Sequence, residues 1–92
     1  MRKFLIEKKL EKILIKLEKK DKALYGQLKK KINEVLNNPD IEHYKNLQYG
    51  LKEYKRVHIR SFVLVFKHDK QKDFIYFDDF DHHDNIYKRK RK

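Results

Sequence analysis

Two histidines set among charged residues are the side chains of this chain best suited to chemistry near neutral pH. His58 lies between Arg56 and Arg60, and His83 lies among aspartates near the C-terminal end. Imidazole has a reference pKa of about 6.5, so a histidine can take up or release a proton under working conditions. Neighbouring positive charge favours the neutral form of His58, which suits a general base. Neighbouring carboxylates favour the protonated form of His83, which suits a general acid.

The segment from Tyr54 to Lys67 must position the first of these histidines, and its pattern predicts two strands. Read with a period of two residues, His58 and its two flanking arginines point to one side, while Val57 and Ile59 point to the other. One face of this strand is therefore cationic, and the other belongs to the core. The five apolar residues from Phe62 to Phe66 predict a second strand that is buried on both faces.

Two helices are expected before these strands. Arg2–Ile6 predicts a short strand that leads into the first helix. Apolar residues recur with helical spacing from Leu10 to Leu17 and again from Leu24 to Leu36, and Asp21 between them is expected to cap the second helix. The proline in Asn37–Asp40 ends that helix. The short connection predicts an antiparallel helical hairpin that covers one face of the sheet.

The remaining strand completes an antiparallel meander. The polar run 67–73 predicts a hairpin turn, and Phe74–Phe77 predicts the strand after it. Ile41–Gly50 is expected to be irregular, and the three strands between Lys52 and Phe77 follow one another with short connections. The fold class is therefore α+β: a short N-terminal strand, a helical hairpin, a three-stranded antiparallel meander and a short C-terminal segment, in one domain spanning residues 1–92.

Composition restricts the partners. The chain carries a formal net charge of +11 with 42% charged and 39% hydrophobic residues, so we expect a folded protein that binds a polyanion or an acidic protein. Cysteine is absent, which excludes disulfides and thiolate metal sites, and the two glycines exclude a Walker-type phosphate loop. We see no signal peptide and no apolar run of membrane-spanning length, so we expect a cytoplasmic protein with no membrane association.

The C-terminal stretch carries two charge patterns. Aspartates and histidines crowd the segment 78–84, but their spacing matches no standard metal site, and we expect neither a metal nor another cofactor. Five consecutive cations follow at 88–92. This basic tail is either a solvated terminus or a source of phosphate contacts.

Three segments carry a resemblance to a known family: KKKINEVLNNPDIEHYKNLQ from Lys29, LKEYKRVHIRSFVLVFK from Leu51, and FDHHDNIY ending at Tyr87. With the order of elements, they resemble the RelE/ParE superfamily of bacterial and archaeal toxins, and look closest to its RelE-like and YafQ-like branches. Members of those branches are ribosome-dependent mRNA interferases. Two family arginines are replaced here, because their positions fall at Val63 and Asp81.

The resemblance implies a catalytic site and a set of RNA contacts. His58 and His83 match the catalytic histidines of YafQ-like toxins, and Tyr87, Arg56 and Arg60 occupy places comparable to RelE residues. The roles expected are a base at His58, an acid at His83, phosphate binding by both arginines, and base stacking or orientation by Tyr87. The alternative for Tyr87 is a purely structural role, in which it packs the C-terminal segment onto the core. Further RNA contacts are expected from Lys45, Lys55, Lys88, Arg89, Lys90 and Arg91.

The function implied is that of a toxin of a type II toxin–antitoxin system, a metal-independent endoribonuclease that cleaves mRNA on the ribosome and inhibits translation. Its partners would be the ribosome, mRNA and an acidic RelB-like antitoxin, with which it would form a hetero-oligomer. Two alternatives stay open: a non-catalytic toxin of the ParE type that binds DNA gyrase, and an inactive binding module. The two histidines favour the nuclease, since a binding surface does not need them.

Overall fold

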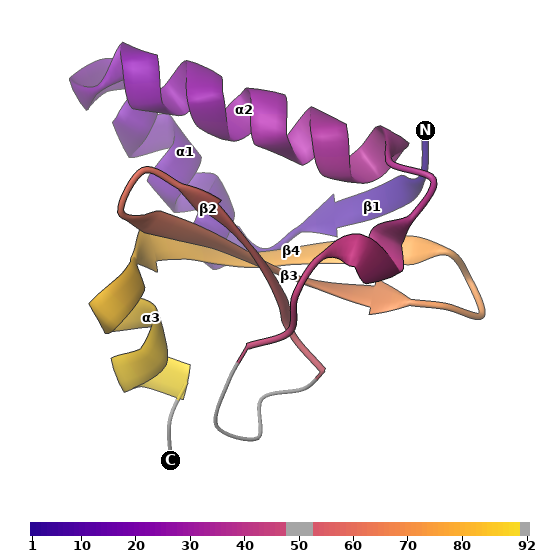
Figure 1. Ribbon diagram of the computed structural model, residues 1–92. Coiled ribbons are helices and arrows are strands. Elements are labelled where there is room, and N and C mark those ends of the chain that lie inside the picture. The colour runs from indigo at the N-terminus through magenta and orange to yellow at the C-terminus, as the bar shows by residue number, and fades with distance from the viewer. Residues whose placement is uncertain (48–52, 91–92) are drawn as a thin grey trace.

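A sheet of four strands with helices on both faces forms the described part of the chain. The computed structural model describes residues 1–47 and 53–90 (Figure 1). None of the helices in these ranges is long and apolar enough to cross a membrane. The elements in chain order are β1 (Lys3–Ile6), α1 (Lys8–Lys20), α2 (Lys22–Asn37), a 3-10 helix (Ile41–His43), β2 (Lys55–Ile59), β3 (Phe62–Asp69), β4 (Phe74–His82) and α3 (His83–Lys90). The predicted α+β class is confirmed.

The sheet has the strand order β1-β4-β3-β2. β2, β3 and β4 pair antiparallel, which confirms the predicted meander, and β1 pairs parallel to β4. The two helices between β1 and β2 provide the crossover that a parallel pair requires. The sequence did not indicate where β1 joins the sheet, because its pairing partner lies about 70 residues away in the chain.

The helical hairpin covers one face of the sheet (Figure 1). α2 begins where predicted, because the Asp21 side chain accepts a hydrogen bond from the backbone N–H of Leu24 at 3.0 Å. Leu10 of α1 is fully buried, and the apolar side of α2 packs with it against the sheet. The fully buried side chains at the centre of this core are Leu10, Leu28, Val35, Leu64, Phe66, Ile75 and Phe77.

The other face of the sheet carries α3 (Figure 1). Ile86 and Tyr87 of α3 pack against Val63 and Val65 of β3. Because Leu64 and Phe66 face the helical hairpin while these two valines face α3, β3 is buried on both sides, as predicted. The second core is small, and it fixes the C-terminal helix.

The C-terminal strand and helix differ from the prediction. β4 was expected to end at Phe77, but it continues to His82 and leads directly into α3. Aspartate is disfavoured in strands, yet Asp79 of β4 is fully buried, with Oδ2 3.0 Å from Nζ of Lys9 on α1. An ion pair between distant segments therefore overrides the local sequence preference in this strand.

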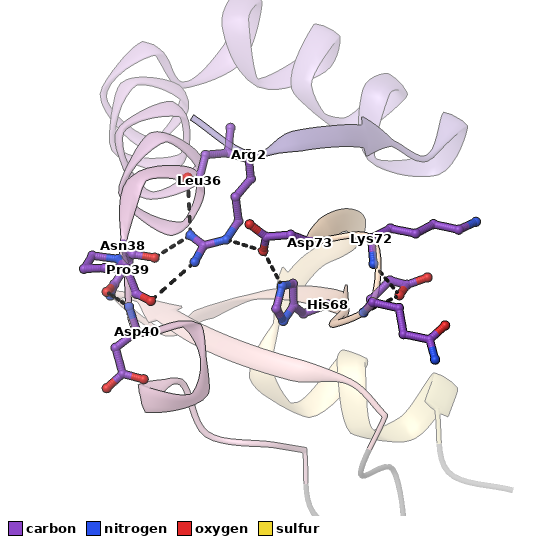
Figure 2. Close-up of polar contacts among 10 residues, drawn as sticks. Arg2, Leu36, Asn38, Pro39, Asp40, His68, Lys72 and Asp73 are labelled. Carbon is purple, nitrogen blue, oxygen red and sulfur yellow. Dashed lines mark hydrogen bonds and ion pairs between the residues drawn. The ribbon is translucent and has the colours of Figure 1, made fainter.

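His68 also differs from expectation, since it falls within the run 67–73 that was predicted to be a hairpin turn. It lies on β3 with its side chain 8% exposed, and its Nε2 atom is 2.8 Å from Oδ1 of Asp73. Nε of Arg2 reaches the same carboxylate oxygen at 2.8 Å, while its guanidinium donates to the backbone carbonyls of Leu36 and Asn38 (Figure 2). This network joins the start of the chain to the end of α2 and to the turn between β3 and β4.

Candidate active site

The two histidines singled out in the sequence lie together. His58 is carried by β2, and His83 is the first residue of α3. Their ring centroids are 5.8 Å apart, and the ring planes are inclined by only 22°. The backbone N–H of His83 donates a hydrogen bond of 3.0 Å to the carbonyl of Ser61, in the turn between β2 and β3. That bond ties the start of α3 to the strand pair that carries His58.

Arg56 lies beside His58 on the same side of β2. Its Nη1 atom is 3.3 Å from Nδ1 of His58, and a guanidinium can only donate, so Nδ1 presents a lone pair there. Partial desolvation lowers the pKa of His58 below its usual value, and the positive charges of Arg56 and His83 lower it further. The neutral form is thus favoured, as expected, but desolvation is the leading cause and Arg60 is not among the causes.

His83 is held on its other side by two neighbours from its own helix. The Tyr87 ring, one turn later, lies with its centroid 4.8 Å from that of His83 in an edge-on arrangement. The Asp84 carboxylate has Oδ1 3.6 Å from His83 Nδ1. Tyr87 is 8% exposed and belongs to the second core, so it both packs α3 and contacts the imidazole.

The expected RNA-contacting cations are distributed unequally around this pair. Lys45 shares a depression of about 480 Å³ with Arg56 and His58. Arg60 was assigned to the strand face but lies in the β2–β3 turn, with a positive φ of 58°. Lys88 is exposed on α3. Of the basic tail, Arg89 and Lys90 fall in the last turn of α3, and Arg91 lies outside the described residues.

Lys55 does not join the site. Its side chain is 10% exposed, and Nζ lies 3.1 Å from the Glu42 carboxylate and 3.2 Å from both the Tyr44 carbonyl and the Asn46 side chain. Lys55 faces the side of the sheet that packs on the helical hairpin, since strand neighbours point in opposite directions. Its ammonium is occupied by these three acceptors and is directed away from the histidine pair.

Two lysines near the site were missed in the sequence. Lys30 and Lys31 of α2 line a groove with His58 and Arg60. In the sequence they belong to the charged side of an amphipathic helix, and nothing in their spacing relates them to a strand almost thirty residues later. Only the packing of α2 over the edge of the sheet brings them close.

The adjacent histidines of the acidic segment 78–84 lie on different sides of the sheet. Among the residues that the structure describes, no three His, Asp or Glu side chains are grouped so that they could hold a metal ion. His82 contacts Phe62, with ring centroids 5.9 Å apart, on the side of the helical hairpin. His83 contacts Tyr87 on the side of α3. The two adjacent histidines therefore belong to different faces of the protein.

Comparison of the chain with known proteins shows which family it belongs to. Over 83 residues the chain is 53% identical to "Putative toxin RelE4" of Methanocaldococcus jannaschii, and the match covers 89% of this chain and 86% of that protein. The chain belongs to the RelE-like toxin family. It is accordingly a RelE-like toxin of the toxin–antitoxin class. An uncharacterized protein of Methanosarcina mazei is 41% identical over 83 residues, covering 89% of this chain and 94% of that protein. No protein-family model matches the chain.

Solved structures of this family share the fold. A variant of YafQ from E. coli superposes with a TM-score of 0.71 at 18% identity, covering 95% of this RelE-like chain and 99% of that one. The RelE toxin in the intact E. coli RelBE toxin–antitoxin complex matches with a TM-score of 0.66 at 24% identity, covering 89% and 96% of the two chains. At these identities the likeness establishes the fold.

Proposed function

We propose that this RelE-like toxin is a ribosome-dependent mRNA endoribonuclease that cleaves by metal-independent general acid–base catalysis. The observation that carries the proposal is the pairing of His58 and His83, whose rings lie 5.8 Å apart beside Arg56. Two imidazoles on facing segments can serve the entering and the leaving oxygen of one phosphodiester. A toxin that acted only by binding a protein target would not require that arrangement.

The reaction assigns one proton transfer to each histidine. His58 accepts the proton of the 2′-hydroxyl at Nδ1, whose lone pair Arg56 releases as its guanidinium turns to the phosphate, and the 2′-oxygen forms a bond to phosphorus. The bond between phosphorus and the 5′-oxygen breaks, and His83 donates its proton to that oxygen. The products are a 2′,3′-cyclic phosphate and a 5′-hydroxyl. The lowered pKa of His58 keeps it ready to accept a proton near neutral pH. The Asp84 carboxylate lies 3.6 Å from Nδ1 of His83.

Arg56 supplies positive charge where the phosphorane develops negative charge. Its guanidinium lies 3.3 Å from the base, so it can reach the same phosphate, and stabilisation of developing charge by fixed donors contributes strongly to catalysis. Lys45 extends the positive surface beside Arg56. Tyr87 acts as a positioning residue that holds the His83 ring.

An acidic antitoxin of the RelB type is the proposed protein partner, and the toxin acts in the cytoplasm, where the ribosome is. The net charge of +11 favours association with an acidic chain. Exposed apolar side chains on β1 and α1 offer the apolar contact that such a partner needs, with Phe4 38%, Leu5 45% and Ile15 53% exposed. The RelE-like toxin of E. coli forms a complex with RelB, which agrees with a hetero-oligomer here.

Cell-free translation with the purified toxin tests the nuclease assignment. Primer extension on a translated mRNA should reveal cleavage within codons that are being translated, and the His58→Ala, His83→Ala double variant should lose it. His82→Ala is the matched control, because this neighbouring histidine faces the other side of the protein, and it should cleave like the wild type. An acidic antitoxin should suppress cleavage.

Two results would contradict the proposal. Full cleavage by the double variant would remove both histidines from the mechanism. Growth arrest on expression with intact mRNA would favour the non-catalytic alternative, and inhibition of DNA gyrase would then be measured.

A further inference from the structure

A second groove meets His58 on the side opposite the Lys45 depression. This groove of about 290 Å³ lies between α2 and the end of the β2–β3 hairpin. Its charged lining residues are Lys30, Lys31, Arg60 and one carboxylate, Glu34, and His58 also lines it. The depression that holds Lys45 and Arg56 also includes His58. The proposed base therefore stands where two cation-lined hollows meet.

The cations of this second groove are available to a ligand. Within residues 1–47 and 53–88, neither the Lys30 ammonium nor the Arg60 guanidinium has an ion-pair partner, whereas Lys31 lies 3.0 Å from Glu34. Lys55, by contrast, is neutralised by a carboxylate in the fold. Free, exposed cations beside a proposed phosphodiester-cleaving site attract phosphate oxygens.

The backbone at Arg60 is a second, independent observation. A two-residue hairpin turn with positive φ normally uses glycine or asparagine, since a side chain with a Cβ is disfavoured there. The chain places Arg60 at φ 58°, in the turn whose other residue, Ser61, accepts the hydrogen bond from His83. Arg60 thus occupies a disfavoured conformation in the turn that also holds the proposed acid, and its side chain lines the groove beside His58.

We propose that the groove of Lys30 and Arg60 is a separate subsite that binds a phosphate of the single-stranded RNA next to the scissile one. The inference rests on the proposed nuclease function. Arg56 precedes His58 by two residues on β2, about 7 Å of extended chain, and Arg60 follows His58 in the turn beyond the end of the strand. The RNA thus runs across β2, from the Lys45 depression past His58 to α2, and Arg60 serves the flanking phosphate while Arg56 serves the reacting one.

Binding of non-cleavable oligonucleotides tests this path without requiring cleavage. The strands carry a 2′-deoxy nucleotide at the cleaved position of a mapped mRNA site and are extended by two nucleotides either on the 5′ side or on the 3′ side. The Lys30→Gln, Arg60→Gln double variant should weaken binding of one series about tenfold or more. Its logarithmic salt dependence should fall by about 1.4, the share of two contacts to a single strand. Lys45→Gln should weaken binding of the opposite series.

Lys16→Gln is the matched control, because this exposed lysine of α1 lies outside both hollows, and it should bind both series like the wild type. Urea midpoints equal to the wild type would show that the variants are folded. Equal weakening of both series, or an effect no larger than that of Lys16→Gln, would overturn the subsite. Normal oligonucleotide binding with lost ribosome binding would also overturn it, since the groove would then serve ribosomal RNA. If the wild type cleaves no translated mRNA, no site can be mapped, and the nuclease proposal fails before the binding experiment, so the two failures are distinguished.

Discussion

Ile86→Ala should separate the two histidines while leaving most of the protein folded. Ile86 is fully buried in the second core, where α3 packs on β3. The substitution removes three carbons, worth about 2.4 kcal/mol of burial, and a residual cavity brings the expected loss to about 3 kcal/mol. α3 has eight residues, fewer than the roughly 12–15 that an isolated helix needs. Its docking should therefore weaken by about a hundredfold.

Hydrogen exchange measured beside cleavage tests this reasoning. Protection of the α3 amides should fall by about two orders of magnitude, protection of the β3 amides should change less, and cleavage should fall with α3 docking because His83 leaves His58. Ile15→Ala makes the same chemical change at a side chain that is 53% exposed, and it should leave both quantities nearly unchanged. Equal loss of protection in α3 and β3, or full cleavage with α3 undocked, would refute the account.

Three further predictions concern charge. Arg56→Gln removes a positive charge that lowers the pKa of His58, so the pKa of His58 should rise toward 6.5. The acidic limb of the pH–rate profile, which lies below pH 6.5, should therefore move to higher pH. An NMR titration of His58 that shows no rise in its pKa would contradict this. Lys9→Met removes the ammonium that pairs with the buried Asp79 carboxylate and should destabilise the fold by about 1–3 kcal/mol in urea unfolding. An unchanged midpoint would show that the ion pair is not needed. Arg2→Gln should lower the free energy of unfolding by about 2–3 kcal/mol, because one guanidinium joins three segments. A loss below about 0.5 kcal/mol, the range of ordinary surface changes, would argue against that role.

Much of the fold could be predicted because its signals are local. The apolar period from Leu24 to Leu36, the cap at Asp21 and the apolar run Phe62–Phe66 each depend on neighbours in the chain, and the structure bears them out. The alternation around His58 also placed it correctly opposite Val57 and Ile59. Patterns of period two and 3.6 report which face is buried without any knowledge of tertiary contacts.

The errors concern residues whose environment is set by distant segments. Lys55 looked like one more cation of a basic strand, but Glu42 and the carbonyl of Tyr44 approach it from the preceding segment and bury it. Asp79 was placed after the last strand, in the C-terminal segment, although it belongs to β4 and pairs with Lys9 of α1. A charge and its partner that lie far apart in sequence leave no periodic signal.

The side chains of the candidate site could be singled out from the sequence, but their geometry could not. Charged neighbours marked His58 and His83 as base and acid, but their approach to 5.8 Å depends on α3 folding back against β3. Arg60 was placed on the strand because the alternation continued through it, whereas the chain turns at that residue. Lys30 was missed for the opposite reason, since α2 reaches the site only through tertiary packing.

A substrate with sulfur in place of the scissile 5′-oxygen gives the most direct test of the acid–base pair. Such an mRNA, programmed on ribosomes, has a leaving group that departs as a thiolate and needs no proton, because a thiol is far more acidic than an alcohol. The account predicts that this substrate restores cleavage by His83→Ala toward the wild-type rate and leaves His58→Ala slow. Equal rescue of both variants, or of neither while the wild type cleaves, would contradict the assignment of base and acid.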